Sequence, residues 1–161
     1  MTTIKYFGVQ GSYSKLQCSK ACHNKLYDNV ELVENMIAKT DCNLRIPSNL
    51  VPICPVCGEK MEVNLRKDAY FVQDAYWHKQ NKAYDDFINN SKDKKVVLLE
   101  LGVGFNTPSI IRFPFEQMTM QNQNWNLVRI NKDDTMTWIN MENKAILIQE
   151  DIGNVVGSLL K

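Results

Sequence analysis

The chain has 161 residues and a formal net charge of +1 at neutral pH. This length suits one domain, or one domain that carries a small metal-binding module. Balanced charge argues against nucleic acid as the main partner, because phosphate binding normally shows as a basic excess. No apolar run approaches the roughly 18 residues that a membrane span requires, and nothing resembling a secretory signal opens the chain. We therefore expect a cytoplasmic protein that binds neither nucleic acid nor a membrane.

The first segment with a clear pattern is a short apolar run over residues 4–9, which Gln10 and Gly11 follow. Such a run, bounded by glycine, predicts a β-strand. By itself, Gln10 is interpreted as an ordinary polar residue at the end of that strand.

Four of the cysteines form two close pairs. Three residues separate Cys18 from Cys22, whereas Cys54 and Cys57 form a C-x-x-C turn followed by Gly58. Two such pairs supply the tetrahedral four-sulfur site that zinc prefers. A shell of four thiolates leaves no open position for water, so we expect this zinc to hold the fold together and to do no chemistry. The alternative is a set of buried or disulfide-bonded thiols, and a reducing compartment disfavours disulfides.

Two helices are predicted around the second cysteine pair. Residues 29–39 lie between the two pairs and carry apolar side chains at helical spacing. Residues 75–90 repeat apolar groups at Trp77, Tyr84 and Phe87, with Lys and Asp on the other face. Both patterns are typical of amphipathic helices.

The last part of the chain is more apolar. Residues 96–101 form a nearly continuous apolar run, which predicts a strand buried on both faces of a parallel sheet. Residues 125–130 and 145–148 predict two further strands, and residues 151–160 a closing amphipathic helix. With a helix after the first of these strands, this order predicts the C-terminal part of a Rossmann-like doubly wound α/β sheet that carries a small four-Cys module.

Two loops of this predicted sheet carry candidate functional residues. The turn over residues 102–108 is rich in glycine and follows the first strand, at the edge where such folds bind nucleotides. Alternatively it is a tight βα loop and nothing more, since the chain lacks a complete G-x-G-x-x-G fingerprint and a P-loop. The adjacent Asp133 and Asp134 are interpreted as a solvated turn at the end of the second strand.

Together, five segments of the chain resemble the sirtuins, and most closely their macrodomain-linked (class M) branch. They are residues 9–13, 16–23, 54–58, 99–108 and 130–131. The resemblance implies an NAD-dependent protein ADP-ribosyltransferase with NAD and structural zinc as cofactors. It further implies a protein acceptor, such as a lipoyl-carrier protein, and a macrodomain hydrolase that removes the modification.

The same resemblance assigns roles to individual residues. Gln10 is the expected catalytic residue, which orients a ribose hydroxyl of NAD. The expected zinc ligands are Cys18, Cys22, Cys54 and Cys57. The residues expected to contact the adenosine side of NAD are Gly102, Val103, Gly104, Asn106, Asn131, Lys132, Asp151 and Ile152.

One departure from the family concerns the reaction. Sirtuin deacylases have a His-Gly step where this chain has Gln10 and Gly11. A Gln amide can hydrogen-bond a ribose hydroxyl, but it cannot accept a proton near neutral pH. Residues 70–74 also lack the Phe-Gly-Glu segment with which deacylases pair their substrate. Lysine deacylation is therefore the alternative activity, and ADP-ribosyl transfer is favoured.

A second departure concerns the extent of the domain. The family's phosphate loop and nicotinamide pocket precede the Gln-Gly step, and this chain contains neither. We divide the chain into the start of the catalytic region (1–17), a zinc-binding module (18–65) and a Rossmann-like NAD-binding half (66–161). We expect a truncated or split sirtuin that is inactive alone. The competing class is a catalytically inactive, zinc-stapled binding module.

Overall fold

The computed structural model describes residues 6–141 and 143–160. The chain forms two compact units, Met1–Asp85 and Asp86–Lys161. Helix α2 (Ala75–Asn89) contains the boundary between them and confirms the helix predicted over residues 75–90. Among the described residues, no helix has the length and apolar character needed to cross a bilayer.

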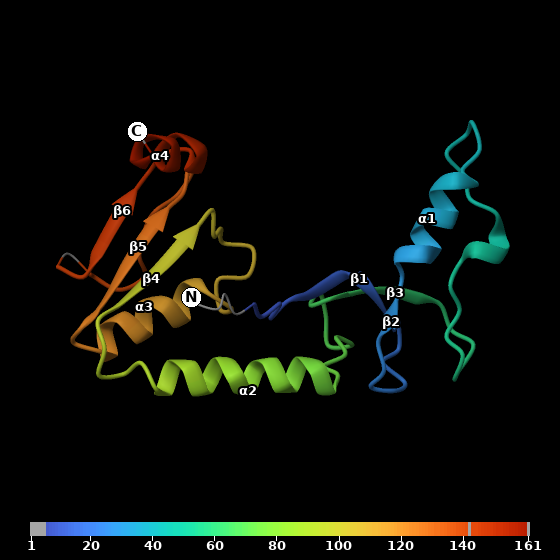
Figure 1. Ribbon diagram of the computed structural model, residues 1–161, viewed down its shortest axis with the longest axis horizontal. Helices are drawn as coiled ribbons and strands as arrows, with labels where there is room; N and C mark the ends of the chain where they lie inside the picture. The colour runs from blue at the N-terminus through green and yellow to red at the C-terminus, as the bar shows by residue number, and fades with distance from the viewer. Residues whose placement is uncertain (1–5, 142, 161) are drawn as a thin grey trace. The chain divides into compact units, whose positions relative to one another are not determined.

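The first unit contains a three-stranded antiparallel sheet in the order β2-β1-β3 (Figure 1). Its strands are β1 (Gly11–Cys18), β2 (Tyr27–Asp28) and β3 (Met61–Leu65). Its other elements are α1 (Val30–Ala38) and a short 3-10 helix, η1 (Ser48–Leu50). Helix α1 confirms the helix predicted between the two cysteine pairs.

The strand predicted over residues 4–9 is wrong over residues 6–9, and residues 4 and 5 lie outside the described residues. A turn occupies this place, closed by a hydrogen bond from the Gly11 N–H to the Gly8 carbonyl oxygen (2.9 Å). The apolar Phe7 packs edge-on against Trp77, with ring centroids 5.4 Å apart, and does not pair in a sheet. Strand β1 begins only at Gly11.

Polar side chains occupy the centre of the first unit. Asn64 is almost fully buried, and its amide donates to the side-chain oxygen of Gln17 (2.7 Å) and to the Val72 carbonyl (3.0 Å). Gly11 has a φ of +95°, and a Cβ there would lie 2.0 Å from the Asn64 carbonyl oxygen. Only glycine fits this position, because it lacks the clashing atom and tolerates positive φ. The packing of Gly11 on Asn64 thus joins the start of β1 to β3.

The second unit contains a parallel sheet in the order β4-β5-β6, as the sequence predicts (Figure 1). Its strands are β4 (Val96–Leu101), β5 (Trp125–Ile130) and β6 (Ala145–Ile148). Its helices, beyond the end of α2, are α3 (Arg112–Gln121) and α4 (Ile152–Leu159). The three strands have the predicted bounds, which confirms the α/β class.

One face of this sheet is buried. The core cluster consists of Leu98, Trp125, Leu127 and Met141. On β4, the alternate residues Val97, Leu99 and Leu101 are 61%, 52% and 46% exposed. The prediction that this strand is buried on both faces is therefore wrong for the described residues. An apolar run shows that a strand is suited to burial, but it does not show which segment covers each face.

Candidate functional site

The two cysteine pairs converge at one point of the first unit. Cys18 ends β1, while Cys54 and Cys57 lie on a turn closed by the Gly58 N–H, which donates to the Cys54 carbonyl (3.0 Å). The sulfur atoms of Cys18 and Cys57 are 3.5 Å apart, and those of Cys22 and Cys54 are 3.6 Å apart. All four sulfurs lie within 4.8 Å of one another. The predicted pairing of the two motifs is confirmed, and the cluster can hold a metal ion.

The donor set fits zinc. A Zn–S bond of about 2.3 Å places the sulfurs of a tetrahedral site about 3.8 Å apart, close to the separations found here. The remaining cysteine, Cys42, is an exposed free thiol outside the cluster. Both the number and the chemistry of the ligands match a closed, structural site.

The four thiols hold their protons unequally. The backbone N–H of Cys22 lowers the pKa of the Cys18 thiol to about 6, although burial acts in the opposite direction. The pKa of Cys22 itself is raised, first by loss of water around its sulfur and then by hydrogen bonds with the neighbouring thiols. Burial would raise the pKa of Cys54, but backbone N–H groups outweigh it and lower that pKa, whereas the pKa of Cys57 is raised. Two of the thiols therefore lose their protons more readily than usual, and two less readily. Four thiolates this close together require a cation to balance their charge.

An imidazole adjoins the cluster. The Nδ1 atom of His23 lies 3.1 Å from the Cys22 sulfur, and its Nε2 atom lies 3.0 Å from the hydroxyl oxygen of Tyr27. Because Tyr27 belongs to β2, these contacts join the cysteine cluster to the sheet. His23 thus stands beside a complete set of four sulfur ligands.

Gln10 lies in the turn that precedes β1, and its backbone is held firmly. The Arg66 N–H donates to the Gln10 carbonyl oxygen (2.9 Å), and the indole N–H of Trp77 donates to the Val9 carbonyl (3.3 Å). These bonds, with the close packing of Gly11, fix the point at which the Gln10 side chain leaves the backbone. A polar side chain on a rigid turn is suited to orienting a ligand group.

The second unit contains a hollow of about 400 Å³ at the carboxyl ends of β4 and β5. Four separate segments supply its walls: the glycine-rich turn after β4, the start of α3, the loop after β5, and the start of α4. The residues predicted for NAD that line it are Gly102, Gly104, Asn131, Lys132, Asp151 and Ile152. Open α/β sheets bind ligands at this edge.

The other two residues predicted to contact NAD, Val103 and Asn106, are not among the described residues that line the hollow. The carbonyl oxygen of Val103 accepts a hydrogen bond from the Asn131 side-chain amide (3.1 Å), so Val103 helps to fix the turn. Asn131 also accepts hydrogen bonds from the backbone N–H groups of Asp133 (2.9 Å) and Asp134 (3.2 Å). It therefore joins the loops after β4 and β5.

Glycine and a helix cap shape the rest of the hollow. Gly102 has a φ of +67°, and a Cβ there would lie 3.2 Å from the Ile152 side chain. A Cβ on Gly104 would meet nothing within 4 Å, so this glycine faces open space. Asp151 caps α4 by accepting from the Gly153 N–H (2.8 Å). The hollow thus has room at Gly104 for a ligand to approach the backbone closely.

Four lining residues are not among those expected to contact NAD, although Phe105 lies within the predicted 102–108 turn. They are Phe105, Arg112, Asp133 and Asp134. The interpretation of the aspartate pair as a solvated turn is wrong for Asp134, because its carboxylate pairs with the fully buried Arg112 at 3.1 Å. The adjacent carboxylates were a visible signal, but their partner lies on α3 and no sequence spacing relates the two.

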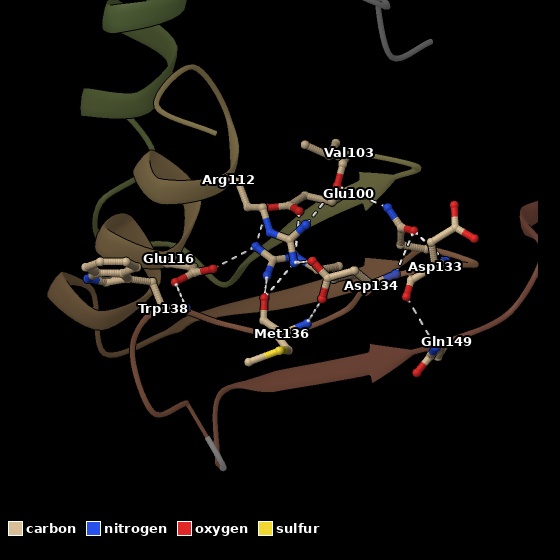
Figure 2. Close-up of polar contacts among 11 residues, drawn as sticks. Glu100, Val103, Arg112, Glu116, Asp133, Asp134, Met136, Trp138 and Gln149 are labelled. Atoms are coloured by element: carbon tan, nitrogen blue, oxygen red, sulfur yellow. Dashed lines mark hydrogen bonds and ion pairs between the residues drawn. The ribbon is translucent and has the colours of Figure 1, made fainter. Parts of the chain in front are cut away.

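A buried charge network supports this edge of the sheet (Figure 2). The Arg129 guanidinium donates to both carboxylate oxygens of Glu100 (2.7 and 3.1 Å) and to Glu116 (2.9 Å). Burial would lower the pKa of Arg129, but the two carboxylates outweigh it and raise that pKa. The other oxygen of Glu116 accepts from the Trp138 N–H (2.7 Å). The network connects β4, β5 and α3 with the loop that precedes β6.

Comparison with known proteins adds two relatives. The chain is 35% identical to a protein ADP-ribosyltransferase of Staphylococcus aureus (strain Mu50) over 156 residues, which cover 96% of this chain and 49% of the relative. It is 33% identical to a probable bifunctional ADP-ribose hydrolase/ADP-ribosyltransferase of Fusarium oxysporum f. sp. cubense over 162 residues, or 94% of this chain and 27% of the relative. No protein-family model matches.

Both relatives are named for ADP-ribosyl transfer, which supports an ADP-ribosyltransferase-like protein at a coarse level. The chain spans about half the length of the Staphylococcus aureus relative and about a quarter of the Fusarium relative. The aligned region covers nearly all of the chain. It therefore includes most of the unit that contains the cysteine cluster and most of the unit that contains the hollow.

Proposed function

We propose that this chain is part of a sirtuin-type, NAD-dependent protein ADP-ribosyltransferase. Zinc bound by the four cysteines stabilises the first unit, and the hollow of the second unit takes the adenosine side of NAD. The observation that supports this most strongly is the convergence of four separate segments on one hollow, with most of the residues expected to contact NAD in its walls. The names of the relatives support the same class of reaction.

The residues around the hollow suit a nucleoside. Asp133 and Asp151 offer carboxylate oxygens that accept hydrogen bonds from ribose hydroxyls, and the open space at Gly104 admits a ring close to the backbone. NAD, when bound, supplies the ADP-ribosyl group through cleavage of its nicotinamide bond. Such a step depends on positioning and electrostatics more than on a strong base. An amide at residue 10 that orients a ribose hydroxyl is sufficient for that task.

We further propose a lipoyl-carrier protein as the acceptor and a macrodomain hydrolase as the enzyme that removes the modification. The name of the Fusarium relative joins an ADP-ribose hydrolase and an ADP-ribosyltransferase in one protein, which is consistent with such a pair. The cytoplasm is the proposed compartment, where reduced thiols and bound zinc are favoured over disulfides.

Nucleotide binding can be tested with a matched pair of glycine variants. A Cβ at Gly104 or at Gly157 would meet nothing within 4 Å, so the fold tolerates valine at either place, but only Gly104 lines the hollow. We expect NAD to shift the amide NMR signals of residues 102–105, 131–134 and 151–152. G104V should abolish these shifts, whereas G157V should retain them. Equal NAD affinity in wild type and G104V would assign the turn a purely structural role.

The type of reaction can be tested at Gln10. In the complete enzyme, with the family's phosphate loop and nicotinamide pocket supplied, Gln10→Ala should abolish ADP-ribosyl transfer from NAD to a lipoyl-carrier protein, since correct positioning is worth several kcal/mol of barrier. Gln10→His tests the deacylase alternative, because histidine can accept a proton near neutral pH. We expect Gln10→His to remain inactive on acetyl-lysine peptides. Deacylation by Gln10→His would favour the alternative activity.

A further inference from the structure

A buried arginine contacts both walls of the hollow (Figure 2). Arg112 is the first residue of α3, and its guanidinium is fully buried. One terminal nitrogen donates to the Val103 carbonyl (3.3 Å), in the turn after β4. The other donates to the Met136 carbonyl (2.6 Å) and pairs with Asp134 (3.1 Å), in the loop after β5. A single side chain thus bridges two loops that are distant in sequence.

The same guanidinium also supports an aromatic residue of the wall. Its carbon lies 4.0 Å from the ring centroid of Phe105, a cation–π contact. Phe105 lines the hollow and is 51% exposed. The Arg112 Nε atom is buried and has no hydrogen-bond partner among the described residues. Burying an unsatisfied donor is unfavourable, so the other contacts must determine where this guanidinium lies.

We infer that Arg112 is a positioning residue, which sets the separation of the 102–105 turn and the 131–136 loop. This inference rests on the proposed function, because the hollow between these loops is the proposed nucleotide site. Arg112 is buried and its charge is balanced by Asp134, so it acts through the loops and not as a ligand for phosphate. Its planar fork contacts the two loops through separate nitrogen atoms at fixed positions, a geometry that the single nitrogen of a lysine does not reproduce.

The role of Arg112 can be tested without unfolding the second unit, because a second arginine, Arg129, holds the same loop. Arg129 also donates to the Met136 carbonyl (2.5 Å). It keeps its bonds to Glu100 and Glu116 when Arg112 is replaced. The loop after β5 therefore stays attached, and loss of Arg112 should release mainly the 102–105 turn.

The test compares Arg112→Lys with Arg112→Gln, by calorimetry with ADP-ribose and by amide hydrogen exchange without ligand. Positioning by the fork predicts that both variants bind about ten-fold more weakly, to a similar extent and with little dependence on salt. It also predicts faster exchange in residues 102–105 and unchanged exchange in β4 and β5. Direct attraction of an anionic ligand predicts near-normal binding by Arg112→Lys and a much larger, salt-dependent loss in Arg112→Gln.

Three results would overturn the inference: normal affinity in both variants, the charge-dependent pattern, or unchanged exchange in the 102–105 turn. If both variants fail to fold, Asp134→Asn makes the same test, because it weakens the hold of Arg112 on the second loop. If wild type does not bind ADP-ribose, the proposed function fails. The hydrogen exchange of the 102–105 turn then still decides whether Arg112 positions it.

Discussion

The two units of the chain bury different kinds of side chain. Among the described residues of the first unit, the buried apolar side chains are few, and two of them belong to the four-cysteine cluster: they are Leu16, Cys18, Cys54 and Val72. The second unit buries larger apolar groups, namely Leu98, Trp125, Leu127, Ile130 and Met141. It also buries the charge network centred on Arg129. We therefore expect the first unit to depend on a metal held by the four cysteines, and the second on apolar packing and paired charges.

This difference suits the roles proposed for the two units. A small unit with little apolar core needs a metal to hold a turn such as the one that carries Gln10. A hollow built from four segments needs a rigid scaffold beneath it, and the buried ion pairs of the second unit supply that scaffold. Each of the following changes should affect one unit and spare the other.

The largest effect is expected from loss of a metal ligand. Cys54→Ser should release the metal and unfold the first unit, because the binding energy of structural zinc is folding energy. Cys42→Ser is the matched control, since Cys42 is exposed and outside the cluster. Elemental analysis and thermal unfolding measure both variants. A Cys54→Ser protein that keeps its metal and its stability would refute the metal-dependent account of the first unit.

Acid should reproduce this loss in the unmodified protein. The folded pKa of Cys18, about 6, lies below its ordinary value. The stability that its thiolate contributes is therefore fully present above the ordinary pKa and is lost as the pH falls through about 6. Because a bound metal competes with protons for the same thiolates, we expect dialysis at about pH 8 to retain the metal and dialysis well below about pH 6 to release it. Metal content that is independent of pH over this range would contradict the thiolate site.

The next effect concerns the buried charges of the second unit. Arg129→Met should destabilise this unit by about 3–5 kcal/mol, because it leaves two buried carboxylates without their partner. Lys15→Met removes an exposed ion pair, Lys15 with Asp28, and should cost about 0–1 kcal/mol. Denaturant unfolding measures both. Equal effects of the two variants would show that the buried network contributes no more than a surface pair.

A smaller effect is expected from three glycines that differ in geometry. Gly11→Ala should cost roughly 2–4 kcal/mol, because the new Cβ would clash with Asn64 at a positive φ. Gly58→Ala adds strain without a clash and should cost about 1–2 kcal/mol. Gly104→Ala should be nearly neutral, since it has open space and no positive φ. Any other ranking of unfolding free energies would show that the turn before β1 is less tightly packed than described.

The smallest effect concerns the cap of α4. Asp151→Ala removes the acceptor for the Gly153 N–H and should cost about 1 kcal/mol, whereas Asp151→Asn keeps an acceptor and should cost less. Unfolding free energies of the second unit measure both. If the two variants lose the same stability, the carboxylate charge matters more than the cap.

Spacing and apolar runs predicted much of this structure. The cysteine pairs and the strands β4, β5 and β6 were all visible because each depends on one short, distinctive segment. Strands β1 and β3 were missed because the side chains they bury most fully include Gln17 and Asn64, which look like surface residues. The apolar run before Gln10 was misassigned as a strand because Phe7 packs on an aromatic side chain from α2.

The walls of the hollow were only partly predictable. Gly102 could be assigned from its place directly after a strand of a parallel sheet, and Asn131 from the family resemblance. Arg112 could not, because its partners lie on two other loops. Pairing between charges distant in sequence is a property of the folded chain and leaves no periodic signal.

Amide NMR spectra of the protein, recorded before and after removal of the metal by a chelator, test the difference between the units most directly. The account predicts that the dispersed signals of residues 11–65 collapse to unfolded positions while those of residues 96–160 remain. Collapse of both sets, or of neither, would contradict the claim that a metal stabilises the first unit and that apolar packing and buried charges stabilise the second.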